Sequence, residues 1–244
     1  MNSYSYESLR AEAAAAGCWI DSRDAQTPRG RGMGNTNKKE RVSRALSWYA
    51  RSESADEADE RLVFAFVAYN ALYARPEYDG KEVNAKAERD AFWHKLLQTG
   101  RDEILKFARA EAGKLKEILS LQYISFLFWK EGDDAREKHE KMRQETDRAK
   151  RITARQLAAG DVRPVNLAME RIGMLRNQIL HGMAAYEDSY NRKQVKACAD
   201  FLHPLVGRMI AAVVRDQKQD WGKVPYPPQG YPNEFRVEVD ELED

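Results

Sequence analysis

The stretch that decides the fold is residues 59–74, DERLVFAFVAYNALYA. Leu62, Phe66, Tyr69 and Tyr73 recur at spacings of four and three residues, which is the period of one face of an α-helix. Further apolar side chains widen this stripe until the segment is apolar nearly all round: Val63, Phe64, Val67 and Leu72. A helix of that kind buries most of its surface, so the sequence predicts a central core helix here.

The helical period continues on both sides of this segment. Helices are expected at residues 6–16, from 38 to about 50, 84–98, 101–129 (one helix or two joined near Gly113), 164–183 and from 191 to beyond 213. The chain has only 14 Gly and 8 Pro, and 32% of its residues are charged, which suits helices with charged outer faces. We therefore predict an all-α protein, an antiparallel helical bundle.

Composition also limits the function. The formal net charge of the 244 residues is +1, which argues against a protein held on nucleic acid or membrane by bulk positive charge. Cys18 and Cys198 lie far apart without a neighbouring histidine, so neither a disulfide framework nor a zinc site is predicted, and no cofactor is expected. The apolar run Leu119–Trp129 is too short for a bilayer, which needs about 20 residues. Glu7 and Glu12 interrupt the N-terminus where a signal peptide is apolar. We expect a soluble, cytoplasmic protein with no membrane partner.

Three regions are predicted along the chain. Residues 1–36 are expected to form a mobile arm, residues 37–220 a helical domain, and residues 221–244 an extended, acidic, Pro- and Tyr-rich tail. Residues 133–160 form a charged helical insertion in that domain, with expected i,i+4 pairs Asp134/Lys138, Glu137/Lys141 and Asp147/Arg151. Because acids offset bases in this insertion, a solvated spacer is favoured, and a helix that grips RNA is the alternative.

One compact run could carry chemistry, RNQILHG at residues 176–182, near the end of the predicted 164–183 helix. The sequence contains no GxSxG, HExxH or Walker motif. Arg176 and His181 are five positions apart, which is about 140° around a helix axis. They flank a second apolar face made by Met169, Gly173, Leu180 and Ala184. Because a mid-helix glycine costs roughly 1 kcal/mol, we expect another helix to pack closely at Gly173, from a second copy of the chain.

A two-fold interface would bring both copies of the run to one shared cleft. His181, at a helix end, could then act as general base or acid. Asn177, one turn earlier, could hydrogen-bond the imidazole and fix its orientation. Arg176 offers a charged fork for a phosphate whose negative charge grows in the transition state. These groups suffice for metal-free cleavage of RNA, in which the 2′-hydroxyl is the nucleophile.

The Arg176–His181 run, with the polar Asn177 after the arginine, resembles the RxxxxH signature of HEPN domains. The segment Phe66–Tyr73 is similar to the early core helix of bacterial HEPN proteins, and the resemblance covers about residues 38–217. It implies a dimeric, metal-independent endoribonuclease of a toxin–antitoxin or antiviral defence system, with RNA as substrate and an antitoxin or defence-system protein as a further partner. It also implies that Arg176 and His181 are the catalytic pair and that Asn177 orients them. HEPN toxins paired with a nucleotidyltransferase antitoxin often have a tyrosine two residues after the histidine, where this chain has Met183, and this departure puts control by tyrosine modification in doubt.

Other interpretations of these residues stay open. An arginine and a histidine near a helix end also serve as ordinary C-cap groups. A catalytically silent helical dimer that binds RNA or a partner protein is the main rival function, and an antitoxin-bound subunit of a two-gene system is another. A basic arm that helps to hold RNA is predicted from Arg29, Arg31, Lys38 and Lys39, with a solvated linker as an equal alternative.

Overall fold

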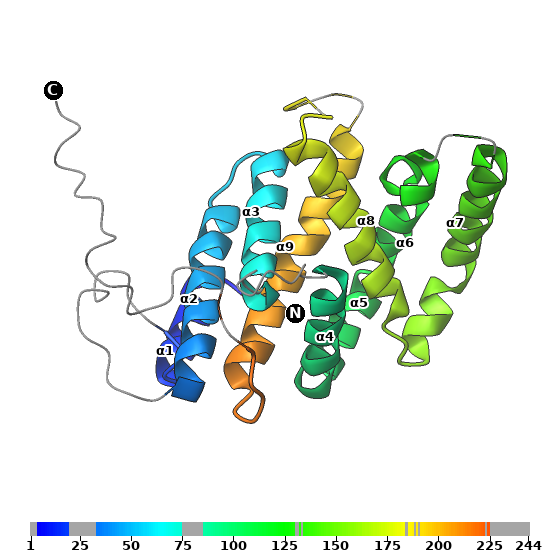
Figure 1. The fold of residues 1–244 in the computed structure, drawn as a ribbon. Helices are drawn as coiled ribbons and strands as arrows, with labels where there is room; N and C mark the ends of the chain where they lie inside the picture. The colour runs from blue at the N-terminus through cyan, green and yellow to red at the C-terminus, as the bar shows by residue number, and fades with distance from the viewer. Residues whose placement is uncertain are drawn as a thin grey trace, which may run out of the picture.

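The computed structural model of the chain describes residues 4–19, 33–74, 85–129, 132, 134–183, 185–187, 189, 191–222 and 224. These residues form nine α-helices, two short 3₁₀ helices and no strand, which confirms the all-α bundle (Figure 1). The helices are α1 (Tyr6–Ala15), α2 (Met33–Glu53), α3 (Ala58–Tyr73), α4 (Ala85–Thr99), α5 (Arg101–Ala110), α6 (Ala112–Ser120), η2 (Gln122–Ile124), η3 (Phe126–Trp129), α7 (Ala135–Ala158), α8 (Arg163–Leu180) and α9 (Arg192–Arg215).

Helix α9 is the centre of the bundle. It packs against seven other helices, α1 to α6 and α8, and 17 of its 24 residues are buried. Gly207 permits one close approach, because a Cβ there would lie 2.7 Å from the Tyr49 hydroxyl oxygen of α2. By length and composition α9 could cross a membrane, but 83% of its most apolar window is buried inside the bundle. Its apolar surface is therefore taken up by the other helices, as in the core helix of a soluble protein.

Helix α3 lies beside α9 and α2 rather than at the centre. Its inner stripe is buried as predicted, with Leu62 and Tyr69 fully enclosed. Val63 and Val67, on its outer side, are only half-buried. The prediction of a central helix was therefore wrong for this segment, because the still more apolar α9 occupies that place.

The predicted N-terminal arm is partly built into the bundle. Leu9 and Ala13 of α1 are fully buried, and the guanidinium of Arg215 at the end of α9 bonds Glu12 of α1 at 2.5 Å. Helix α2 begins at Met33, five residues before the predicted start. The prediction of a mobile arm was wrong for these residues, because α1 has an apolar stripe that the bundle covers. Residues 20–32 lie outside the described part of the chain.

The expected run of helix over residues 101–129 is broken. It divides at Glu111 into α5 and α6, ends at Ser120, and continues as the two 3₁₀ helices. Side chains of α8 bind carbonyls of this irregular stretch: Arg171 donates to the Leu121 oxygen and Gln178 to the Tyr123 oxygen, both at 2.9 Å. Of the predicted tail, Trp221 packs on Phe92 of α4 at a ring distance of 5.7 Å, and residues 225–244 lie outside the described part.

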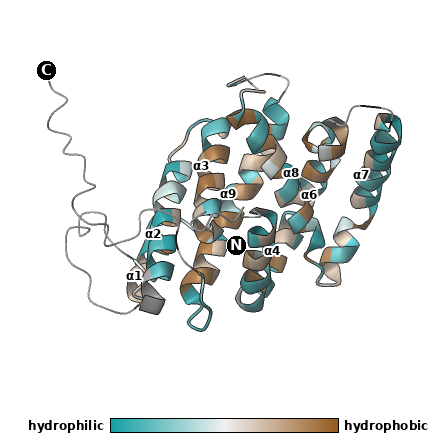
Figure 2. Cartoon of the chain, viewed as in Figure 1, coloured by the Kyte–Doolittle hydropathy of each residue, from teal (hydrophilic) through white to brown (hydrophobic). Residues whose placement is uncertain are grey.

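Helix α7 stands at the edge of the bundle, where its outer faces are strongly hydrophilic (Figures 1 and 2). It is a packed helix on one side only. Five residues form its buried stripe, which lies against α6 and the adjacent helices: Met142, Thr146, Ala149, Thr153 and Leu157. Arg109 of α5 donates to the Leu157 carbonyl at 2.8 Å and so caps the end of α7.

Candidate functional site

Helix α8 ends in a well-formed C-cap that fixes His181. Gly182 adopts a positive φ of 69°, and its N–H donates to the Ile179 carbonyl at 3.1 Å. The N–H of Met183 donates to the Gln178 carbonyl at 2.8 Å, which completes a Schellman motif. His181 is the C-cap residue, and its side chain is exposed. The backbone thus presents this imidazole to solvent at a defined position.

Arg176 lies half-buried between α8 and α3. Its guanidinium carbon is 4.5 Å from the Phe66 ring centroid, and its Nη1 donates to the Asn177 Oδ1 at 2.8 Å. Burial lowers the pKa of Arg176, and the electrostatic effect of Tyr73 opposes this shift. Asn177 was expected to hold the imidazole of His181. Its side chain instead holds the guanidinium, because the two side chains are neighbours along the helix surface.

One copy of the chain does not bring Arg176 and His181 together. The guanidinium faces Phe66 of α3, whereas the imidazole stands at the exposed end of α8. No hydrogen bond joins these two side chains within the described residues. A small hollow of about 20 Å³ lies at the C-terminal end of α3 and includes no residue of 176–182. Its lining residues are Leu72, Tyr73, Glu88, Ala91, Phe92, Lys95 and Trp221. A site that uses both groups therefore needs a second surface.

The second apolar face of α8 is covered mainly by the chain itself. Met169 is only 2% exposed, and a Cβ on Gly173 would lie 3.9 Å from the Phe66 ring. The expectation that a second copy packs on these two residues was wrong, because Met169 is buried within the chain and Phe66 of α3 already lies beside Gly173. Leu180 is 55% exposed, and Ala184 lies outside the described residues.

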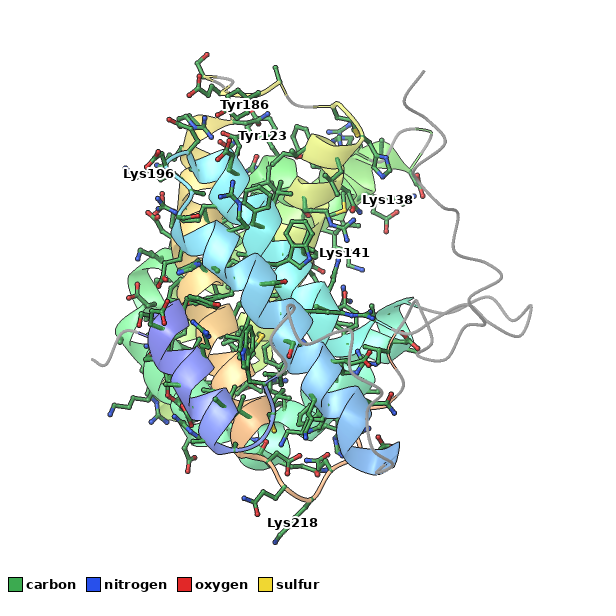
Figure 3. The ribbon with its side chains drawn as sticks, turned by 90° about the vertical axis from the view of Figure 1, so that its left-hand side faces the viewer. Tyr123, Lys138, Lys141, Tyr186, Lys196 and Lys218 are labelled. Carbon is green, nitrogen blue, oxygen red and sulfur yellow. The ribbon has the colours of Figure 1, made fainter. Side chains whose placement is uncertain are left out.

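Exposed apolar side chains surround the end of α8, a feature that the sequence analysis did not find. Met183 is 62% exposed, Tyr186 60% and Tyr123 54%, close to the value for Leu180. Tyr123 and Tyr186 lie at the same end of the molecule (Figure 3). We call these four residues the apolar end. Helical periodicity could not reveal it, because three of the four residues lie outside α-helices.

The apolar end also has an acidic neighbourhood. Desolvation raises the pKa of Tyr186, and carboxylates add to this shift in the order Glu187, Glu60, Glu57 and Asp59. Three of these carboxylates belong to the start of α3 and the turn before it. Arg192 of α9 is paired with Asp59, so one of the four charges is compensated.

The predicted basic arm is not an RNA surface at Lys38. This side chain is 8% exposed, and its Nζ donates to the carbonyls of Val214, at 3.0 Å, and Asp216. Arg41 likewise donates to the Ala74 carbonyl at 3.0 Å. Both cations cap helix C-termini, which explains their burial. Lys39 is half-buried, and Arg29 and Arg31 lie outside the described residues.

The other histidines have structural surroundings. His203 of α9 stacks on Tyr49 at a ring distance of 4.4 Å, and its Nδ1 lies 2.9 Å from the Ser52 hydroxyl. Burial, and secondarily Arg61, lowers the pKa of His203 to about 4. His94 lies within hydrogen-bond distance of Gln98 in α4, at 3.0 Å, and His139 lies 2.8 Å from the Phe128 carbonyl oxygen. Within the described residues, no group of three or more His, Cys, Asp or Glu is arranged to hold a metal.

Comparison with known proteins gives no match, whether to family models, to curated proteins or to solved structures. The end of α8 and the surfaces around it are therefore the features from which a function can be inferred.

Proposed function

We propose that the chain is a metal-independent endoribonuclease of the HEPN type that works as a cytoplasmic homodimer, in a toxin or antiviral defence role. The end of α8 carries the proposal. His181 is exposed on a C-cap that a Schellman motif fixes, and Asn177 holds the guanidinium of Arg176 about one turn before it. An exposed imidazole on a fixed backbone can transfer protons and a held cation can stabilise the phosphorane, and metal-free RNA cleavage uses both kinds of group.

The reaction is an internal transesterification. The imidazole of His181 takes the proton of a 2′-hydroxyl, whose oxygen attacks the adjacent phosphorus. The bond from phosphorus to the 5′-oxygen breaks, and the protonated His181 of the other copy gives its proton to that leaving oxygen. Arg176 stabilises the charge on the phosphorane. The products are a 2′,3′-cyclic phosphate and a 5′-hydroxyl.

The homodimer supplies the second surface that one copy lacks. Leu180, Met183 and Tyr186 offer apolar contact area directly beside His181. A two-fold contact through this apolar end would place both imidazoles at one cleft, because a symmetric interface uses the same patch on each copy. This contact replaces the face around Met169 and Gly173, which the chain covers itself.

The test is incubation of purified protein with total RNA and tRNA in excess EDTA. The parent is expected to cleave, and His181→Ala and Arg176→Ala are expected to lose at least about 100-fold in rate. His94→Ala is the matched control, because it removes another exposed histidine and should cleave like the parent. End-group analysis should find cyclic phosphates. Cleavage by His181→Ala at the parental rate would show that the assignment is wrong.

The carboxylates around Tyr186 favour a second function, a non-catalytic module that binds a partner protein. Negative charge beside the apolar end repels RNA phosphates, while exposed apolar residues suit a protein contact. Under this function the parent has no RNase activity, and Leu180→Asp abolishes partner binding while His181→Ala leaves it intact.

A further inference from the structure

Helix α7 concentrates the positive charge of a nearly neutral chain. Its 24 residues contain eight Lys or Arg and four Asp or Glu, so its formal charge is +4. The whole chain carries +1, which leaves −3 for all other residues. Acids and bases were expected to offset one another over residues 133–160, whereas α7 itself, which begins after Asp133 and Asp134, is net basic.

Two of the four acids of α7 form ion pairs within the described residues, and the expected pair Glu137/Lys141 is not among them. Glu140 is paired with Arg143 at 2.7 Å, and it also accepts from the Gln144 amide at 3.0 Å. Asp147 is paired with Lys150 at 3.7 Å, rather than with Arg151 as expected. Asp134, before the helix, is paired with Lys138 as predicted.

Besides Arg136, which lies on another side of the helix, four exposed cations of α7 have no ion-pair partner among the residues that the structure describes. These residues, which we call the basic stripe, are Lys141, Arg148, Arg151 and Arg155. At 100° per residue they lie within an arc of about 80°, and they extend over about 21 Å of helix. Between Lys141 and Arg155 the other residue in this line is the uncharged Gln144, and the acidic Glu137 continues the line one turn before Lys141.

The basic stripe contrasts with the use of arginine in the rest of the bundle. Arg41, Arg109 and Arg171 donate to backbone carbonyls and are thereby committed to the fold. Arg208 of α9 does the same, and Arg215 is paired with two carboxylates. The stripe makes no such contribution, so its guanidinium groups are available to an external anion.

The start of α7 lies at the same end of the bundle as the end of α8. His139 of α7 stacks on Phe128, and Phe128 packs on Tyr123 at a ring distance of 4.8 Å. The carbonyl of Tyr123 in turn accepts from Gln178 of α8. The basic stripe therefore runs along the bundle away from the end that carries His181.

We infer that the basic stripe of α7 binds the phosphate backbone of the RNA substrate, an inference that rests on the proposed function. Three of its four cations are arginines, whose planar fork matches phosphate. Arg148, Arg151 and Arg155 follow one another at about 4.5 and 6 Å along the axis, so neighbouring phosphates of one strand can each meet a guanidinium. A membrane is a poor partner, because the apolar side of α7 is packed on the bundle.

The test compares two triple variants of equal charge in a His181→Ala background, so that the RNA stays intact. One is Arg148→Gln/Arg151→Gln/Arg155→Gln. The control is Lys106→Gln/Lys196→Gln/Lys218→Gln, which removes three exposed lysines from other helices and from the segment after α9. Lys196 and Lys218 lie far from Lys141 in Figure 3. Binding of a labelled single-stranded oligoribonucleotide is measured by anisotropy over a range of salt concentrations, and circular dichroism checks the fold.

The stripe variant is expected to lose about tenfold or more in affinity, and the slope of log K against log salt should fall by about 2, since each phosphate contact to a single strand contributes about 0.7. The control should keep the parental slope. Equal affinity and slope in both variants would overturn the inference. Binding of poly-glutamate is measured in the same way. If the stripe variant loses affinity for poly-glutamate and for RNA equally, the inference is also overturned, because the surface would then be a general polyanion site. Failure of the nuclease proposal is separate, since it appears as no cleavage by the parent or as cleavage that does not depend on His181.

Discussion

Helices α7 and α9 are each 24 residues long, yet the bundle uses them in opposite ways. Seventeen residues of α9 are buried, against five of α7. Even the charged Arg208 of α9 is enclosed, with its guanidinium carbon 4.3 Å from the Phe107 ring. Helix α7 buries one stripe, and Figure 2 shows that most of its length is hydrophilic.

The difference separates stability from recognition. The buried side chains of α9 contact seven other helices, so a change to one of them must disturb packing. Most side chains of α7 contact water, so a change there can alter binding without altering the fold. Three comparisons of variants in α7 and α9 test this difference.

The largest effect is expected from a pair of leucines with nearly equal burial, Leu205 of α9 and Leu157 of α7. Leu205→Ala should destabilise the protein by about 4 kcal/mol, because the surrounding helices cannot collapse into the cavity. Leu157→Ala, at the edge of the bundle, should cost about 2 kcal/mol, because its neighbours can relax. Urea unfolding measures both free energies. Equal losses would mean that α7 is as much a core element as α9.

The next largest change is expected in the pH dependence of stability, which two histidines can test. The pKa of His203 in α9 is lowered to about 4, so below its ordinary value near 6.5 the unfolded state binds a proton that the folded state does not. Stability should therefore fall as the pH falls, by about 2 kcal/mol between pH 7 and pH 5. His203→Gln should remove this component. His139→Gln on α7 is the control for loss of an imidazole, and it should retain the dependence.

The smallest change in the free energy of unfolding is expected for substitutions in the basic stripe. Arg148→Gln should change the free energy of unfolding by less than about 0.5 kcal/mol, because the side chain is exposed and has no ion-pair partner among the described residues. The same substitution at Arg208 should cost about 1–2 kcal/mol, since its Nη1 bond to the Pro204 carbonyl, 2.7 Å, is lost. A destabilised Arg148→Gln variant would contradict the separation of stability from recognition.

Local patterns predicted most of the helices. The period of α3, the proline in the first turn of α8 and the apolar spacing of α9 located those elements to within a few residues, because one buried stripe leaves a strong periodic signal. The centre of the bundle was misplaced, since two segments were both apolar enough and only their packing decides between them. The break at Ser120 had no local signal beyond a cluster of aromatic residues.

The candidate site was less predictable than the fold. The sequence placed the run near the end of the helix at residues 164–183, and the structure ends α8 at Leu180, with Gly182 in the left-handed conformation that a C-cap favours. The partner of Asn177 and the burial of Lys38 depend on contacts with residues distant in sequence or on rotamers, and no spacing encodes them. The basic stripe could be identified only from two facts together: the position of each side chain around the α7 axis and the ion pairs seen in the structure.

The central position of α9 has a consequence for the order in which the bundle can close during synthesis. The apolar stripe of α3 is complete at Tyr73 and α2 precedes it, but α9, which covers α3 together with α2, extends to Arg215. At 5–20 residues per second, the delay is roughly 7–28 s. Throughout that interval the nascent chain carries uncovered aromatic side chains that chaperones or a second nascent chain can bind. Two copies made on one messenger RNA would therefore meet while their cores are still open.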